Sequence, residues 1–159
     1  MRLALQSLGS PPMRTATFFR RLGRTSWRER LLLAEAIAAI GAASAAIRLL
    51  PFRTLAARLS RFQGRQGPRA PAAFVESAAW AVRASAPFLP WRSVCFQRGL
   101  ALHWMLRRRG VPTVLHYGVG QGSGKGLSAH VWVSLDGEIL IGGEEAEGHA
   151  CLATYPGQG

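Results

Sequence analysis

The fold is decided by the stretch Ser93-Val-Cys-Phe-Gln-Arg-Gly-Leu-Ala-Leu-His-Trp-Met-Leu-Arg-Arg-Arg-Gly110. Ser93 is a typical N-cap, Gly110 is a typical helix stop, and the arginines before it suit the negative end of the helix dipole. The stretch therefore predicts one helix, with Cys95 in its second position beside unpaired backbone N–H groups. Together with Arg92 and Arg98, this place favours the nucleophilic thiolate. The alternative is that Cys95 is simply a small buried hydrophobic residue.

Downstream of this helix the hydrophobic period changes to that of strands. We expect strands over 113–119, 129–135 and 138–141, with Asp136-Gly137 as a two-residue hairpin turn between the last two. In the middle strand, alternation puts His130 on the same face as Trp132. Helices followed by an antiparallel sheet make the expected class α+β.

Upstream of Cys95 the sequence predicts a helical half. Ser26 followed by Glu29 is a capping box, and a long apolar helix is expected over 31–50. Shorter helices are expected over 53–61 and 72–86. The expected domain organisation is a mobile basic arm over 1–26, a helical part over 27–63, a Gly- and Pro-rich linker over 64–71 and the protein's core over 72–159.

The apolar helix over 31–50 has the length of a transmembrane helix, since about 20 apolar residues span a bilayer. Glu35 and Arg48 lie within it, however, and alanine, which inserts weakly, dominates its composition. A buried or groove-lying helix is therefore favoured, with no stable membrane insertion. The opening residues have too short an apolar run for a secretory signal, and two cysteines fit a reducing cytosol, so a cytoplasmic location is expected.

Composition and charge limit the classes of function. The chain has 159 residues, of which 48% are hydrophobic, so a single globular domain is expected and wholesale disorder is not. Its formal net charge is +12, and every basic residue except Lys125 is an arginine that precedes Val111. Such a field attracts a nucleic acid, a membrane surface or an acidic protein or peptide. No aromatic residues interleave with the arginines on a predicted strand, so no nucleic-acid partner is expected.

No metal or cofactor site is expected. His149 and Cys151 are too sparse for a zinc site. Gly124-Lys125 resembles part of a phosphate-binding loop, but Gly126 stands where Ser or Thr is needed, and Val119 where the first glycine is needed. This glycine-rich segment is interpreted as a flexible loop between two strands.

Cys95 and His130 together form the main chemical hypothesis. A cysteine at a helix start and a histidine on a following sheet make the Cys–His arrangement of papain-like enzymes. The histidine takes the thiol proton and later protonates the leaving amine. His103 within the helix and His116 on the first strand are weaker candidates.

Three segments carry a resemblance to a known family: Leu89-Pro-Trp-Arg-Ser-Val-Cys95, Arg108-Arg-Gly-Val-Pro112 and Ala129-His-Val-Trp-Val133. They resemble the lasso-peptide leader peptidases, the B proteins of lasso-peptide biosynthesis in the transglutaminase-like cysteine protease superfamily. The resemblance covers roughly residues 30–156 and implies a transglutaminase- or papain-like fold, with Cys95 as nucleophile and His130 as base.

The resemblance also implies a function and partners. Such a protein cuts the leader from a ribosomally made lasso precursor peptide. A partner cyclase, similar to asparagine synthetase, then joins the freed amine to an acidic side chain. The length of the chain resembles the split form of the family, in which a separate leader-recognition protein binds the leader. The alternative function is a weak or inactive adaptor that assembles the leader-binding protein and the cyclase.

The third catalytic residue departs from the family's pattern. The resemblance implies an Asp 12 residues after His130, but position 142 is Gly. With Asp136-Gly137 as the turn, His130 is expected to pair with Gly143, and Asp136 itself is too far away, about 20 Å along the strand.

Two alternatives remain for the group that orients the imidazole. Glu144 or Glu145, just past the predicted partner of His130, is expected to reach back, and Glu144 is preferred. Alternatively a backbone carbonyl orients the ring, which leaves a Cys–His dyad with weaker stabilisation of the imidazolium.

Overall fold

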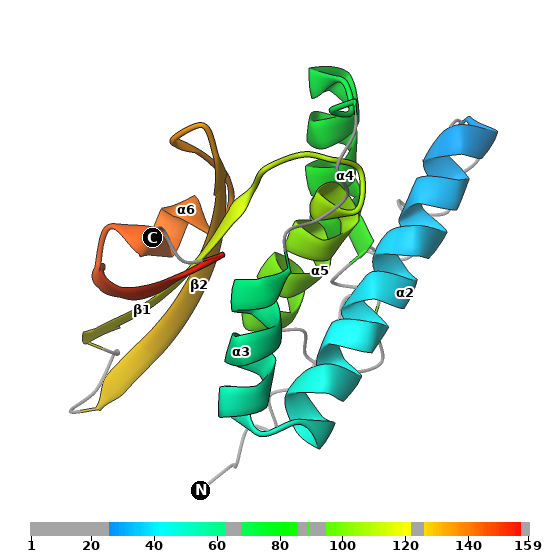
Figure 1. Cartoon of the computed structure of the whole chain (residues 1–159). Helices are drawn as coiled ribbons and strands as arrows, with labels where there is room; N and C mark the ends of the chain where they lie inside the picture. Colours follow the sequence, from blue (N-terminus) through cyan, green and yellow to red (C-terminus); the bar gives the residue numbers. More distant parts are fainter. Residues whose placement is uncertain (1–25, 63–67, 86–88, 90–94, 122–125, 157–159) are drawn as a thin grey trace, which may run out of the picture.

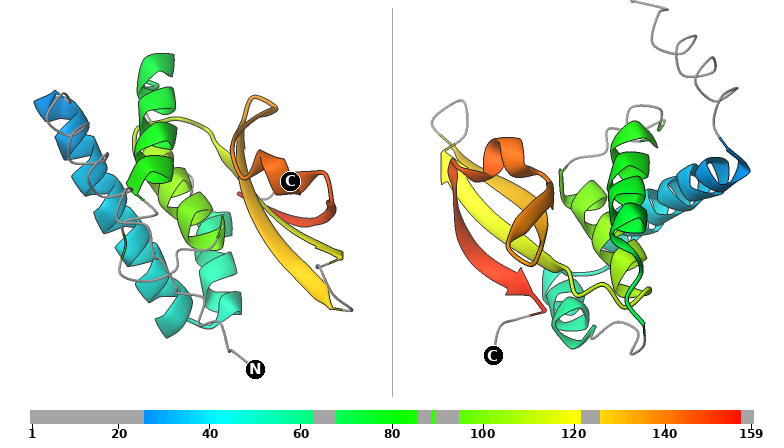
Figure 2. Two further views of the ribbon diagram at one scale, coloured as in Figure 1. Left: turned by 180° about the vertical axis from the view of Figure 1, so that it is seen from behind. Right: turned by 90° about the horizontal axis from the view of Figure 1, so that it is seen from above.

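The computed structural model describes residues 26–62, 68–85, 89, 95–121 and 126–156. Helices α2, α3, α4 and α5 lie together on one side of a four-stranded antiparallel sheet (Figure 1), an arrangement that the two views of Figure 2 also show. The sheet order is β3-β2-β1-β4, so the predicted α+β class is confirmed. The elements are α2 (Trp27–Leu49), α3 (Phe52–Arg61), α4 (Ala72–Ser85), α5 (Cys95–Arg107), β1 (Val114–Gln121), β2 (Leu127–Leu135), β3 (Glu138–Ile141), α6 (Gly143–Ala146) and β4 (His149–Tyr155).

Helix α2 begins as its sequence predicts. The Ser26 backbone N–H donates to the Glu29 carboxylate at 2.6 Å, and the Glu29 backbone N–H donates to the Ser26 hydroxyl at 3.3 Å, which completes the capping box. The helix ends at Leu49, just before Pro51. Its buried face contains Leu33, Ala36, Ile40, Ala43 and Ser44, and α2 packs with this face against α4 and α5.

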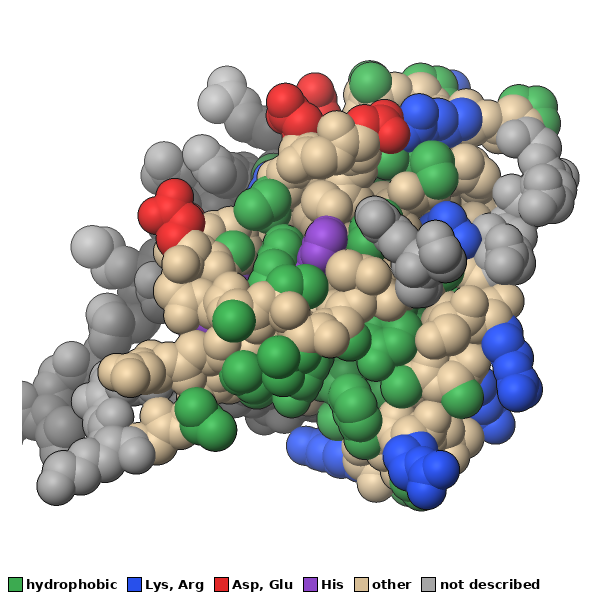
Figure 3. All heavy atoms as spheres, turned by 60° about the vertical axis from the view of Figure 1, so that its left-hand side comes forward, with side chains coloured by type: hydrophobic (Ala, Val, Ile, Leu, Met, Phe, Trp, Pro, Cys, Tyr) green, Lys and Arg blue, Asp and Glu red, His purple; other side chains and the backbone are tan. Residues whose placement is uncertain are grey.

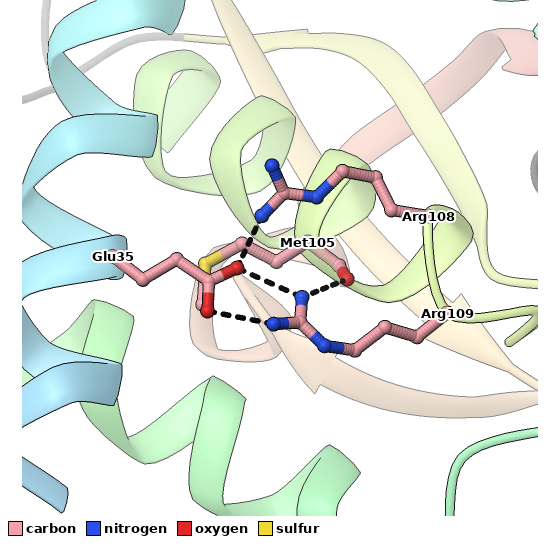
Figure 4. Close-up of polar contacts among 4 residues, drawn as sticks. All are labelled: Glu35, Met105, Arg108 and Arg109. Atoms are coloured by element: carbon pink, nitrogen blue, oxygen red, sulfur yellow. Dashed lines mark hydrogen bonds and ion pairs between the residues drawn. The ribbon is translucent and has the colours of Figure 1, made fainter. Parts of the chain in front are cut away.

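One ion-pair cluster joins the middle of α2 to the end of α5 (Figure 4). The Arg109 guanidinium donates to both oxygens of the Glu35 carboxylate, each at 2.8 Å, and Arg108 also donates to that carboxylate. Arg109 is further held by the Met105 carbonyl at 3.0 Å and lies over the ring of Phe74. The acid in the apolar helix therefore has a structural role in the packing of α2.

Helix α5 meets the sheet through a glycine. A Cβ atom at Gly99 would lie 2.8 Å from the Cγ1 atom of Val131, closer than real side chains approach. The absence of a side chain lets α5 pack directly on β2, against Val131 and Val133. Because successive side chains alternate, His130 and Trp132 lie on the opposite face of β2.

The hairpin turn is as predicted, but the end of the sheet is not. Asp136 and Gly137 both have left-handed backbone conformations, with φ of 52° and 91°, as a two-residue hairpin turn requires. The sequence analysis missed α6 and β4, and β4 completes the sheet by pairing with β1. Strand β4 has a weak alternating pattern in its sequence, so its place is set by the exposed edge of β1 instead.

Several expectations fall on residues outside the described part. These are residues 1–25 of the predicted arm, most of the predicted linker over 64–71, the predicted N-cap Ser93 and the glycine-rich loop over 122–125. At the described end of the linker, Arg69 forms an ion pair with Asp136 at 2.7 Å. Helices α2, α4 and α5 share one hydrophobic core with the sheet.

Candidate active site

Cys95 is the first described residue of α5. It lies four residues before Gly99, so it occupies the helix face that turns toward β2. Its thiol is free and half-buried. No hydrogen bond joins its thiol to a described residue, and its predicted second position in the helix stays a prediction, because residues 90–94 lie outside the described part.

His130 is held firmly on β2. Its side chain is buried, and its ring contacts those of Trp132 and His149 at centroid distances of 6.1 and 5.2 Å. The Nε2–H group donates a hydrogen bond of 2.8 Å to the carbonyl oxygen of Gly142. This bond requires the proton on Nε2, so Nδ1 is the nitrogen that can accept a proton from a thiol.

Gly142 occupies the position where the family resemblance implies an Asp. Its φ is +82°, and a Cβ atom there would lie 2.7 Å from the Val131 carbonyl oxygen and 3.1 Å from the Trp132 Cα atom. A side chain therefore does not fit, and the backbone carbonyl of Gly142 orients the imidazole. This is the second of the two alternatives from the sequence.

Glu144 lies nearby in α6, and its role as orienting carboxylate stays a prediction. It is exposed, it lines the same cleft as His130, and it makes no hydrogen bond to His130 in the described residues. Glu145 belongs to α6 as well.

The predicted register between β2 and β3 is only partly correct. Leu135 pairs with Glu138 as expected, but the pairing shifts between Val133 and Ser134, and Val133 pairs with Ile141. The expected pairing of His130 with Gly143 is wrong, because β3 ends at Ile141 and the chain turns into α6. A bulge of this kind re-aims the chain, and here it brings the Gly142 carbonyl to the imidazole.

Cys95 and His130 line one cleft of about 280 Å³. Its walls come from α4 and α5 on one side and from β2, β3 and the start of α6 on the other. No hydrogen bond joins Cys95 to His130 in the described residues, and β2 presents the imidazole on the face away from α5. The structure thus brings the two residues to one cleft without a hydrogen bond between these two described side chains.

Two arginines also line this cleft. Arg98 is one helical turn after Cys95, and its Nε atom is buried without a hydrogen-bond partner in the described residues. Arg83 donates to the Leu140 carbonyl at 2.7 Å, which joins α4 to β3. Arg98 could be noted from its place near Cys95, whereas nothing in the local sequence pattern of α4 marks Arg83. On the face drawn in Figure 3, acidic side chains lie along the upper and left edges, and basic side chains lie mainly along the right-hand and lower edges.

Outside this cleft, a thiol–imidazole contact lies on the outer face of the sheet. The Cys151 Sγ atom is 3.9 Å from His116 Nδ1, and His116 Nε2 is 2.7 Å from the Ser134 hydroxyl. His116 stacks on Trp132, and burial lowers the pKa of its imidazole. The sequence analysis did not pair these residues, because it did not predict β4.

Comparison with known proteins identifies the family. A family model described as "Transglutaminase-like superfamily" matches residues 36–153. The chain belongs to the transglutaminase-like superfamily. No curated protein and no solved structure matches it. The matched segment of this transglutaminase-like chain contains both Cys95 and His130 and most of α2 through β4.

The remaining histidine of interest belongs to the core of the transglutaminase-like domain. His103 is fully buried in α5, and its Nδ1 atom is 3.1 Å from the Thr113 hydroxyl. Burial lowers the pKa of His103 to about 3, so the imidazole is neutral near pH 7. Among the described residues, no three His, Cys, Asp or Glu side chains lie together in a way that could hold a metal ion.

Proposed function

We propose that this transglutaminase-like protein is a cytoplasmic cysteine peptidase that removes the leader from a lasso-peptide precursor. A separate leader-recognition protein would present the precursor, and an asparagine-synthetase-like cyclase would use the freed amine. One observation carries the proposal: Cys95 and His130 line a common cleft. In that cleft the Gly142 carbonyl holds the imidazole of His130, with Nδ1 as the basic nitrogen.

The chemistry follows from these two groups. His130 Nδ1 takes the Cys95 proton while the sulfur attacks the carbonyl carbon at the leader–core junction. The tetrahedral intermediate collapses when His130 returns the proton to the leaving amine, which frees the core and leaves the leader as a thioester on Cys95. Water, deprotonated by His130, then attacks the thioester, and the thiol is restored.

The two residues have to approach each other when the substrate binds. Catalytic hydrogen bonds are often long in the free enzyme and tighten only in the substrate complex. The two side chains would approach each other around the edge of β2, beside the end of β3, where both line the cleft. A bound precursor segment in this cleft would bridge them.

The replacement of a carboxylate by a carbonyl has a kinetic consequence. The Gly142 carbonyl fixes the tautomer of His130, but it carries no full charge to stabilise the imidazolium that forms in the transition state. We therefore expect slow turnover.

Mass spectrometry of a lasso precursor peptide tests the proposal. The precursor is incubated with the leader-recognition protein and wild type, Cys95→Ala or Cys151→Ala. We expect a single cut with wild type and Cys151→Ala, and none with Cys95→Ala. A cut that survives in Cys95→Ala would disprove the assigned nucleophile.

The second candidate is the non-catalytic adaptor. It is favoured by Gly142 in place of an Asp and by the lack of a hydrogen bond between Cys95 and His130. It predicts no cut with any of the three proteins, but equal binding of each to the leader-recognition protein and the cyclase.

A further inference from the structure

Helix α2 has an exposed face that is apolar along its whole length. The residues concerned recur every three or four positions, so they form one stripe on the helix. Large side chains stand at its two ends, where Trp27 is 67%, Leu31 60% and Leu49 80% exposed. We call the set the outer stripe; it consists of Trp27, Leu31, Ala34, Ala38, Gly41, Ala42, Ala45 and Leu49.

The outer stripe has no partner in the described part of the chain. Helix α2 packs on α4, α5 and α3 with its opposite face. Figures 1 and 2 show α2 at the edge of the molecule, with the other helices on one side only. An apolar face of this length on a protein surface is typical of an interaction site.

Gly41, in the middle of the stripe, points to the shape of the partner. A glycine inside a helix is less stable than alanine, so it usually has a packing reason. Among the described residues there is none, because a Cβ atom at Gly41 would meet none of their atoms within 4 Å. Together with Ala38 and Ala42, it forms a flat surface on which the backbone of another helix can approach closely.

The charges beside the stripe indicate the sign of the charge that a partner should carry. Arg28 and Arg48 lie at its two ends, and both are exposed. The acidic residues of α2 are engaged elsewhere, Glu29 in the capping box and Glu35 with Arg108 and Arg109 (Figure 4). A second copy of this chain would bring like charges together in either direction, so complementarity favours acidic flanks.

A lipid surface is the less favoured occupant. The helix is long and apolar enough to cross a membrane by length and composition. The centre of the stripe, however, consists of alanine and glycine, which bury little apolar area in a bilayer, whereas small residues serve close helix packing.

We propose that the outer stripe of α2 docks an amphipathic helix of a partner protein, with an apolar face and acidic flanking residues. The cleft that contains Cys95 and His130 is separate from this surface, which lies on the far side of the helical layer from the sheet. The inference therefore stands apart from the proposed peptidase activity.

The test uses the full chain and a labelled synthetic helix as probe. The probe has Leu and Ala along one face and Glu beside it, and a matched peptide has Lys in place of Glu. Fluorescence anisotropy measures binding to wild type, Ala38→Glu, Gly41→Leu and Arg48→Glu. The control is Ala57→Glu, which places the same charge at an exposed position of α3.

We expect the Glu peptide to bind wild type and Ala57→Glu alike, and the Lys peptide to bind less well. Gly41→Leu and Ala38→Glu should weaken binding about tenfold or more, because they overfill or charge the contact. Arg48→Glu should reduce the preference for the Glu peptide. Gly41→Ala should raise the Tm of the free protein while it weakens binding, and this variant is decisive if the bulkier ones do not fold.

Three results would overturn the proposal. The first is equal binding of both peptides, or binding that the α2 variants leave unchanged. The second is self-association in sedimentation equilibrium that Ala38→Glu abolishes, which would assign the stripe to a second copy. The third is binding to vesicles of phosphatidylcholine and phosphatidylglycerol that Ala38→Glu abolishes, which would assign it to a lipid surface.

Discussion

Among single residues, Gly142 shows how a backbone carbonyl can hold an imidazole in one orientation. Its left-handed conformation and the closeness of the Val131 carbonyl leave no space for a Cβ atom. The same geometry aims the Gly142 carbonyl at His130 Nε2. The tautomer that a carboxylate would select is thus selected by the path of the main chain.

Substitution of Gly142 should be more costly than its conformation alone explains. Gly137 also has a positive φ, of +91°, but a Cβ atom there would meet nothing within 4 Å. We expect Gly137→Ala to lower the free energy of unfolding by about 1 kcal/mol, the cost of a left-handed residue, and Gly142→Ala to lower it by more. Urea unfolding of the two variants measures the difference, and equal losses would contradict the steric argument.

His103 makes a prediction for the pH dependence of stability. The pKa of His103 is about 3 in the folded protein against an ordinary value of 6.5, so between these pH values the unfolded chain binds a proton that the folded protein does not. The contribution of neutral His103 to the free energy of unfolding is therefore complete above pH 6.5 and is lost as the pH falls toward 3. We expect a slope of up to about 1.4 kcal/mol per pH unit, which should flatten in His103→Gln. Urea unfolding at several pH values measures this, and an unchanged slope in the variant would exclude His103 as its source.

At the level of elements, the contact between α5 and β2 connects the core to the site. Gly99 allows the helix that begins with Cys95 to lie against the strand that contains His130. A methyl group at Gly99 would push these elements apart, which would change the cleft as well as the core.

We expect Gly99→Ala to destabilise the protein although alanine is the better helix former. The gain in helix propensity is about 1 kcal/mol, whereas overpacking costs about 1–3 kcal/mol. Thermal unfolding measures the net loss, and cleavage of the precursor should fall with it. Gly41→Ala is the matched control, since it offers the same propensity gain without a clash; a Tm for Gly99→Ala as high as that of the control would refute the packing argument.

The ion pair between α2 and α5 can be tested in the same way. Glu35 and Arg109 are one-quarter to one-third exposed and bound through two hydrogen bonds. We expect a double-mutant cycle of Glu35→Ala and Arg109→Ala to give a coupling of about 1 kcal/mol that decreases in high salt. Additive losses in the cycle would show that the pair contributes nothing beyond its separate contacts.

The elements that could be predicted from the sequence are those with local signals. The capping box at Ser26, Pro51 after α2, and the turn at Asp136-Gly137 each determine a boundary through their own chemistry. Strand β4 and the shift in register between Val133 and Ser134 could not be predicted, because both depend on contacts with distant parts of the chain.

The same distinction holds for the candidate site. Cys95 and His130 could be proposed from the order of a helix start and a strand. The role of the Gly142 carbonyl depends on a positive φ after a short edge strand, which a sequence pattern does not specify. The Cys151–His116 contact depends on β4 and was missed with it.

Across the whole molecule, the charge asymmetry of the sequence becomes a spatial one. Arginines dominate the helical half, and the acidic residues after Val111 lie on the sheet half, as Figure 3 shows for one face. The cleft with Cys95 lies between the two halves, and the outer stripe lies at the far edge of the helical half. One protein can thus hold a peptide at the cleft and a partner at α2 without overlap.

The central claim, that Cys95 and His130 act as a nucleophile–base pair, can be tested without any substrate. Limiting iodoacetamide is added near pH 6, and mass spectrometry compares alkylation of Cys95 with that of the exposed Cys151, in wild type and His130→Phe. We predict faster alkylation of Cys95 than of Cys151 in wild type, and a selective loss of this advantage in His130→Phe. Equal or faster alkylation of Cys151, or a Cys95 rate that His130→Phe leaves unchanged, would contradict the claim.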